Sequence, residues 1–179
     1  LGALLAVIHK GEVDEERRSL IKTALWAEQA LRLQLSIDEE RLQQLASEFA
    51  QTPDGANDFL LQARWMVNNR PEVERIKLLD SAGHPAQTIP PCETEPEAVQ
   101  TTRDTFLMAR ALGHQTYSAP MSTAIGPARI ELHQPIYQGE RFGGMIVAVI
   151  SLPGLLDAHL PWWFAERYRV EITDATGIV

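Results

Sequence analysis

Hydrophobic residues recur every three or four positions through the first third of the chain, a spacing that predicts helices. Residues 12–35 contain no Gly or Pro, and their apolar positions keep helical spacing among charged residues. Ser36 followed by Glu39 is a capping-box pattern, so a second helix is expected to begin there. The two segments form either a helix pair or one bent helix. A third, shorter helix is expected around residues 59–66, ending before Pro71.

Alternation of apolar and polar residues replaces helical spacing from Val73 onward, which predicts strands. A helix interrupts them over residues 95–112, and Gly113 stands where its C-terminal cap is expected. Three extended segments follow, beginning at His114, Ala128 and Gly143. The last is continuously apolar, as expected of a central strand covered on both faces. The fold class is therefore α+β, with one long helix or a helix pair packed on a five-stranded antiparallel sheet.

Two segments near opposite ends of this pattern resemble each other: RIKLLDSAG at 75–83 and RVEITDATG at 169–177. In each, an alternating run meets an Asp-x-x-Gly turn, where Asp bonds the backbone two residues on and Gly adopts a positive φ. Each is expected to be the first arm of a β-hairpin, so a second, similar unit starts near the end of the chain. Only two residues follow Gly177. We therefore expect no return strand there, and we interpret the chain as part of a longer protein.

The first eight residues are almost wholly apolar and are followed by His9, Lys10 and a strongly charged segment. They suit a core strand or helix end, or the last turns of a transmembrane helix. The charged helix that follows favours the second interpretation, so we assign residues 1–11 to the end of a transmembrane segment and its juxtamembrane link. No continuous apolar run reaches the length of about 18 residues that spans a bilayer.

Composition and motifs exclude several classes of protein. The net charge is -8, and no large Lys/Arg cluster is present, so a nucleic-acid partner is not expected. The single cysteine, Cys92, excludes an internal disulfide and a paired-cysteine metal site. Nucleophile-elbow, Walker, H-E-x-x-H and G-x-G-x-x-G motifs are all missing, so we expect no catalytic activity in this chain.

The order of elements, entered through a long N-terminal helix, resembles the extracytoplasmic PAS-like sensor domain of bacterial membrane receptors, the Cache or PDC family. Residues 17–35 are similar to the helix that leaves the first transmembrane segment in proteobacterial sensor histidine kinases. Residues 142–177 are similar to the last strand of a distal unit that continues through a linking helix into a second unit. The resemblance implies N-terminal helices at 12–70, a PAS-like sensor unit at 71–155, and a linking helix with the first strand of a truncated second unit at 156–179.

The resemblance also implies a periplasmic, membrane-anchored sensor that forms a homodimer through its long helix, with Leu20, Ala24 and Leu31 facing the mate. A small molecule or partner protein would supply the signal, and a histidine kinase outside this chain would give the output. Alternatives are the input domain of a diguanylate cyclase or chemoreceptor, or a structural and dimerisation module without ligand. A cytoplasmic PAS domain with an organic cofactor is disfavoured by the apolar start and the long helix, so no cofactor is expected.

The resemblance further implies a ligand site between the sheet and the helix at residues 95–112 that crosses it. The expected ligand is a small anion or amino acid. Arginine can hold a carboxylate through two parallel bonds, and tyrosine and histidine add neutral or switchable donors. The candidate ligand-binding residues are Arg110, Tyr117, Arg129, His133 and Tyr137. The alternative interpretation is that the arginines are surface residues paired with neighbouring carboxylates.

The segment that begins at Ala128 also carries residues that could bind a metal ion. Glu131 and His133 share one face, and His114 lies on another strand. A polar, solvated strand face explains these residues equally well. We therefore expect no metal ligands.

Overall fold

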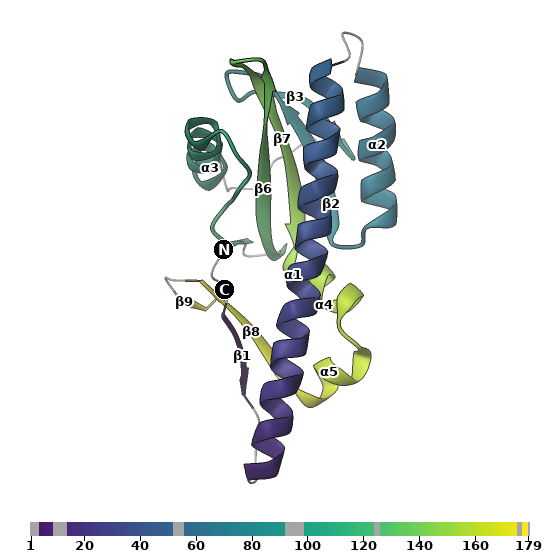
Figure 1. Cartoon of the computed structure of the whole chain (residues 1–179), viewed down its shortest axis with the longest axis vertical. Helices are drawn as coiled ribbons and strands as arrows, with labels where there is room; N and C mark the ends of the chain where they lie inside the picture. The colour runs from purple at the N-terminus through teal and green to yellow at the C-terminus, as the bar shows by residue number, and fades with distance from the viewer. Residues whose placement is uncertain are drawn as a thin grey trace.

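The computed structural model describes residues 4–8, 14–51, 56–91, 99–123, 126–174 and 177–178 (Figure 1). The helices are α1 (Asp14–Gln51), α2 (Ala56–Asn69), α3 (Val99–Leu112), α4 (Leu152–His159) and α5 (Trp162–Arg167). The strands are β1 (Leu4–Ile8), β2 (Val73–Leu79), β3 (Pro85–Ile89), β4 (Thr116–Tyr117), β5 (Met121–Thr123), β6 (Gly126–Gln138), β7 (Arg141–Ser151), β8 (Arg169–Asp174) and β9 (Gly177–Ile178).

One continuous helix, α1, runs along both sheets of the molecule over 38 residues (Figure 1). The expected helix boundary at Ser36 and Glu39 was therefore wrong. Ser36 is exposed, while Gln34 and Asp38 on either side of it are buried against the rest of the chain. Packing of one continuous face thus holds the helix through a sequence that favours a cap, as tertiary contacts commonly do.

The larger sheet has the strand order β3-β2-β7-β6-β4, and β5 adds a sixth strand by pairing with β6. All its pairings are antiparallel. The prediction of an antiparallel sheet with β7 at its centre is confirmed, and the buried stretch of β7 continues to Ser151. The predicted number of strands was one too low, because β5 is short and the sequence around it lacks a clear alternation.

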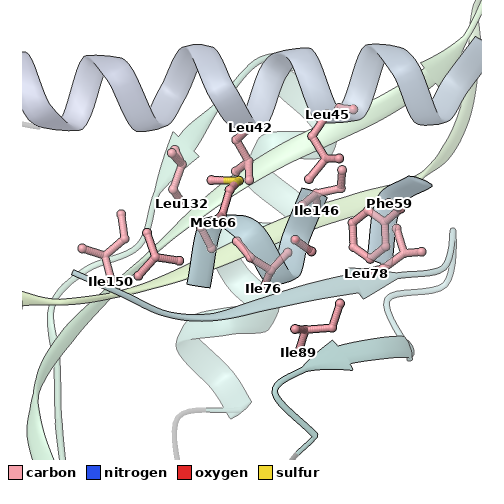
Figure 2. Packing of buried hydrophobic residues seen from close by; sticks show 14 of the residues in the cluster. Leu42, Leu45, Phe59, Met66, Ile76, Leu78, Ile89, Leu132, Ile146 and Ile150 are labelled. Atoms are coloured by element: carbon pink, nitrogen blue, oxygen red, sulfur yellow. The ribbon is translucent and has the colours of Figure 1, made fainter. Parts of the chain in front are cut away.

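Helices cover both faces of this sheet, and α3 lies on the opposite side from α1 and α2 (Figure 1). The main core fills the face under α1 and α2 (Figure 2). Its largest members include Leu42, Leu45, Phe59, Met66, Ile76, Leu132, Ile146 and Ile150. On the other face, α3 packs Phe106 and Ala109 against Leu79, Met145 and Val147. Because strand residues alternate between faces, the odd-numbered positions of β6 and those of β2 from Arg75 onward lie on the α3 side. Val73 precedes a shift in register and belongs to the main core.

The first predicted hairpin turn is confirmed between β2 and β3. Asp80 Oδ1 accepts hydrogen bonds from the backbone N–H groups of Ala82 at 2.8 Å and His84 at 2.9 Å. Gly83 has a φ of 90°, which a residue with a side chain rarely adopts. Asp and Gly therefore do here what their spacing predicts.

A second sheet has the order β1-β8-β9, with β1 antiparallel to β8 (Figure 1). The helical interpretation of the apolar start was therefore wrong for Leu4–Ile8, which form a strand. A short apolar run suits either structure, and here β8 supplies the backbone partner. The expectation that no return strand follows Gly177 was also wrong, since β9 pairs with β8. Within the described residues, no helix is long and apolar enough to cross a membrane.

Helices α4 and α5 connect the two sheets and pack against the N-terminal half of α1. Their contact buries Ala27 and Leu31 of α1 together with Leu155, Phe164 and Tyr168. Two of the residues expected to face a dimer mate therefore have partners within the chain: Leu31 belongs to this cluster, and Leu20 packs against it. Leu20 and Leu31 therefore lie on the side of α1 that packs against α4 and α5, the helices that connect the two sheets.

Candidate functional site

A buried polar triad lies on the α3 face of the larger sheet. Lys77 Nζ of β2 lies 3.2 Å from Glu131 Oε1 of β6. The other carboxylate oxygen of Glu131 lies 3.0 Å from His133 Nε2. Strand register explains this meeting, because Lys77 and His133 both pair with Val147 of the intervening strand β7. All three polar side chains are buried.

The triad keeps Glu131 ionised. Burial alone would raise the pKa of its carboxyl, but the hydrogen bond with His133 and the charge of Lys77 outweigh burial, so the pKa lies below its usual value. Thr102 of α3 adds a further hydrogen bond that lowers this pKa. Glu131 is therefore an anion whose charge is already neutralised. His133 Nδ1 is buried and has no hydrogen-bond partner among the residues that the structure describes.

Two arginines border the triad. Arg75 and Glu131 lie on either side of Val149, with which both pair. Arg75 Nε is shielded from solvent and lacks a hydrogen-bond partner in the described ranges. Arg129 Nε lies 2.6 Å from Glu74 Oε2. Among the described residues of this face, Lys77 and the two arginines are permanent cations and stand against the carboxylates of Glu74 and Glu131. This excess of positive charge suits a negatively charged ligand.

Two hydrogen bonds between Ser118 and Glu131 fix one end of the site. Ser118 N donates to Glu131 O at 2.8 Å, and Glu131 N donates to Ser118 Oγ at 2.8 Å. Ser118 thus holds the β6 backbone in place after β4 ends. Thr105 of α3 is also buried and donates its hydroxyl to Thr101 O at 2.8 Å. These hydrogen bonds within the protein hold the backbone around Glu131 in place.

The structure brings together some of the residues predicted from the sequence and separates others. Arg129 and His133 lie on the α3 face of β6, flanking Glu131. Arg110 and Tyr137 meet at the C-terminal end of α3, where Tyr137 Oη donates to Arg110 O at 2.8 Å. The Arg110 guanidinium lies 4.9 Å from the centroid of the Phe142 ring. These two residues fasten α3 to the sheet.

Tyr117 lies on the opposite face from the other four. It pairs with Leu132, whose side chain belongs to the core under α1, and it packs against that same core. Burial, followed by the charge of Glu39, raises the pKa of its phenol. Its two-residue strand gives no alternation from which its facing could be predicted. The structure therefore places Tyr117 away from Arg129 and His133.

The metal ligands weighed from the sequence do not come together. His114 is exposed and its Nδ1 lies 2.8 Å from Gln115 O, next to it in the chain. Across the described part of the chain, no group of three or more His, Cys, Asp or Glu side chains has the arrangement of a metal site. The Glu131 and His133 pair instead contacts Lys77.

Sequence reasoning missed Arg75 and Lys77. The signal was present, since both cations occupy the positions between the apolar residues of β2. An alternating strand is ordinarily polar on its solvent face, so these two cations gave no sign of an enclosed site. Coverage by α3 turns the same positions into an enclosed, charged surface.

Comparisons with known proteins agree with this architecture. No family model matches the chain. Over its whole length the chain is 32% identical to the C4-dicarboxylate transport sensor protein DctS of Rhodobacter capsulatus, and it spans 26% of that protein.

Solved structures share the fold. The ligand-binding domain of the Pseudomonas aeruginosa amino acid chemoreceptor PctC in complex with GABA matches 79% of this chain and 66% of that one, with a TM-score of 0.63 and 16% identity. The ligand-binding domain of the Pseudomonas fluorescens chemoreceptor CtaA in complex with L-serine matches 81% of this chain and 63% of that one, with a TM-score of 0.62 and 16% identity.

Proposed function

The chain is a sensor domain with the PAS-like fold of Cache-type receptors, and we propose that it is the periplasmic input domain of a transmembrane histidine kinase. Similarity to a transport sensor protein along the whole chain supports a kinase output over a chemoreceptor one, since the chemoreceptor structures share only the fold. The chain corresponds to about a quarter of that relative, which leaves room for membrane segments and an output module. A diguanylate cyclase or chemoreceptor output is the alternative.

The proposed ligand is a small dicarboxylate bound on the α3 face of the larger sheet. The observation that carries this proposal is the excess of positive charge around the Lys77, Glu131 and His133 triad. An amino-acid ligand needs a carboxylate available for its ammonium group. Here Glu131 already contacts Lys77 and His133, and Glu74 is paired with Arg129. The relative's name, which refers to C4-dicarboxylates, agrees with this charge argument.

Each polar residue has a proposed role. Arg75 and Arg129 hold carboxylate oxygens through their guanidinium groups, which are planar and match a carboxylate in geometry. His133 donates from Nε2 to Glu131, so its buried Nδ1 is available to accept a hydrogen bond from a hydroxyl group of a ligand. Arg110 and Tyr137 anchor the C-terminal end of α3, so their contribution is to hold this helix against the sheet. Tyr117 supports the α1 side of the sheet.

Signal transmission follows from the contacts of the sheet. A ligand that contacts both α3 and the strands draws them together, and the opposite face of those strands packs on α1. Helix α4, which continues from β7, contacts α1 and β6. A ligand can shift these helices only as far as its affinities for the two arrangements differ. The proposed output is a small displacement of α1 and α4 relative to the larger sheet.

The proposed homodimer uses the side of α1 that α4 and α5 leave uncovered. Ile21, Leu25 and Leu33 are 50%, 53% and 64% exposed there. Exposed apolar residues along one helix suit contact with a second copy of the same helix. This side replaces the one marked by Leu20 and Leu31, which packs within the chain.

A thermal-shift panel tests the proposed ligand class. Succinate, fumarate and malate are compared with acetate, GABA and L-serine on the parent chain and on Arg75→Gln and Arg129→Gln. Losing one charged hydrogen-bond partner costs about 2–3 kcal/mol, so each variant is expected to weaken binding by roughly thirty-fold or more. Arg103→Gln, an exposed change on α3, is the matched control and should keep the parent affinity.

Other outcomes of this panel point elsewhere. Stabilisation by GABA or L-serine alone would make the domain an amino-acid sensor and contradict the charge argument. Stabilisation by no compound would favour the ligand-free structural module.

A further inference from the structure

A second buried polar cluster lies at the junction of α1, α4 and the turn before β2, away from the α3 face. Asp38 of α1 is 1% exposed, and Glu72 of the turn is fully buried. Gln34 Nε2 of α1 donates to Glu72 Oε1 at 2.7 Å. His159 Nε2, at the end of α4, lies 3.3 Å from Glu72 Oε2. Arg70 completes the cluster.

This junction connects the parts of the molecule that a signal must cross. The backbone O of Glu72 accepts a hydrogen bond from Ser151 N at 2.8 Å, directly before α4 begins. The Glu72 side chain contacts α1 on one side and the far end of α4 on the other. Helix α4 leads through α5 to β8, which belongs to the smaller sheet. Glu72 therefore links the larger sheet, the long helix and the connection to the second sheet.

The charges of the cluster do not balance when both carboxyl groups are ionised. Arg70 is its only permanent cation among the described residues, and its nitrogens lie 3.9 Å from Asp38 Oδ1 and 4.0 Å from Glu72 Oε1. Both oxygens of Asp38 are shielded from solvent, and its side-chain hydrogen bonds are to Glu72 and Gln34 rather than to a cation. Burying an ion this way is costly, and a proton removes the cost.

The surroundings agree that Asp38 holds a proton near neutral pH. Burial, reinforced by the negative charge of Glu72 and opposed by Arg70, raises the pKa of Asp38 to about 7. Other ionisable groups that face the pair are Glu39 of α1, Tyr117 of β4 and His159 of α4. Within the described chain these groups do not form a metal site, which leaves a proton as the species that neutralises the pair.

We propose that Asp38 and Glu72 form a proton-controlled latch between α1 and α4, so that ambient pH regulates transmission from the larger sheet to the smaller one. With one proton on the pair, α4 is seated against α1. Loss of the proton leaves two buried carboxylates beside one distant guanidinium. Their repulsion displaces Glu72 from its place between α1 and His159, and this loosens α4. The latch is separate from the ligand site and does not depend on the identity of the ligand.

Hydrogen exchange of the α4 amides in the chain of residues 1–179, at pH 6 and pH 8.5 and corrected for intrinsic rates, tests the latch. Linkage for a carboxyl that opens from a pKa of about 7 to its ordinary value predicts about a tenfold loss of α4 protection between these pH values. In Asp38→Asn, which cannot ionise, protection should be the same at both. Glu40→Gln, an exposed neighbour on α1, should behave like the parent.

Equal α4 protection at the two pH values in the parent would overturn the proposal, as would a tenfold change that persists in Asp38→Asn. A carbon-13 NMR titration of the parent carboxyl groups gives an answer that requires no variant to fold. A midpoint for Asp38 near 7 supports the latch, and a midpoint in the ordinary range of aspartate contradicts it.

Discussion

Lys77 Nζ of β2 lies 3.2 Å from Glu131 Oε1 of β6 beneath α3, and both side chains are almost completely shielded from water. A buried ion pair of this kind is weak evidence for stability, because desolvation cancels much of the attraction. Its placement on the covered face of a sensor sheet gives it another use. We propose that it leaves Arg75 to bind a ligand, together with the terminal nitrogens of Arg129, whose Nε is paired with Glu74.

Breaking the pair from one side should be costly. Lys77→Met leaves the buried carboxylate of Glu131 without the charge of Lys77, so the free energy of unfolding measured in urea should fall by about 3–5 kcal/mol. The double variant Lys77→Met with Glu131→Gln removes both charges and should recover part of this loss. A single variant as stable as the parent would show that the pair is not buried in solution.

Acid should weaken the domain through Glu131. Its folded-state pKa lies below the ordinary value of 4.5, so its contribution to stability is present above pH 4.5 and is lost as the pH falls toward the folded-state pKa. Unfolding free energies between pH 5 and pH 3 should therefore fall more steeply for the parent than for Glu131→Gln. The exposed Glu140→Gln should follow the parent. Identical slopes for the parent and Glu131→Gln would contradict the assigned contacts.

Gly144 allows β7 to approach β2 closely. Its φ is 155°, and a Cβ atom there would overlap the backbone O of Leu79. Gly144→Ala should therefore destabilise the domain by about 2–4 kcal/mol in a denaturant titration. Gly139→Ala is the matched control: its φ is 64°, but no atom lies within 4 Å of the added Cβ, so the expected cost is about 1 kcal/mol. Equal losses would mean that the close approach is absent.

The exposed side of α1 should face a second copy in the full-length receptor. Cysteine at Leu25, which is 53% exposed, should crosslink in membranes, whereas cysteine at the fully buried Ala27 should not. Positions 21 and 33 should also crosslink, because they share the exposed side. Preferential crosslinking at Ala27 would instead mean that α4 and α5 leave α1 in the receptor.

Local chemistry made much of the fold predictable. The Asp80 and Gly83 turn, the unbroken apolar run of β7 and the helix that ends at Gly113 each depend on neighbouring residues, and all three were predicted correctly. Gly113 takes a φ of 71° and its N–H bonds to Ala109 O at 2.9 Å. The failures involve distant partners. Leu4–Ile8 became a strand through β8, and Ser36 stayed helical because Asp38 is buried against a turn more than thirty residues away.

The candidate site was predictable only in part for the same reason. Arg129 and His133 were correctly expected to share a face, because residues alternate along β6. Tyr117 was misplaced because the facing of a two-residue strand depends on its register with Leu132. Lys77 and Asp38 were missed because their burial depends on helices contributed by other parts of the chain.

Hydrogen exchange with and without succinate tests the central claim most directly, because it locates the site as well as detecting binding. The account predicts slower exchange in α3 and in residues 129–133 of β6, with no change around a groove of about 470 Å³ between α2 and β3, lined in part by Arg64 and Gln87. Slower exchange at that groove, with α3 and β6 unchanged, would contradict the proposed ligand site.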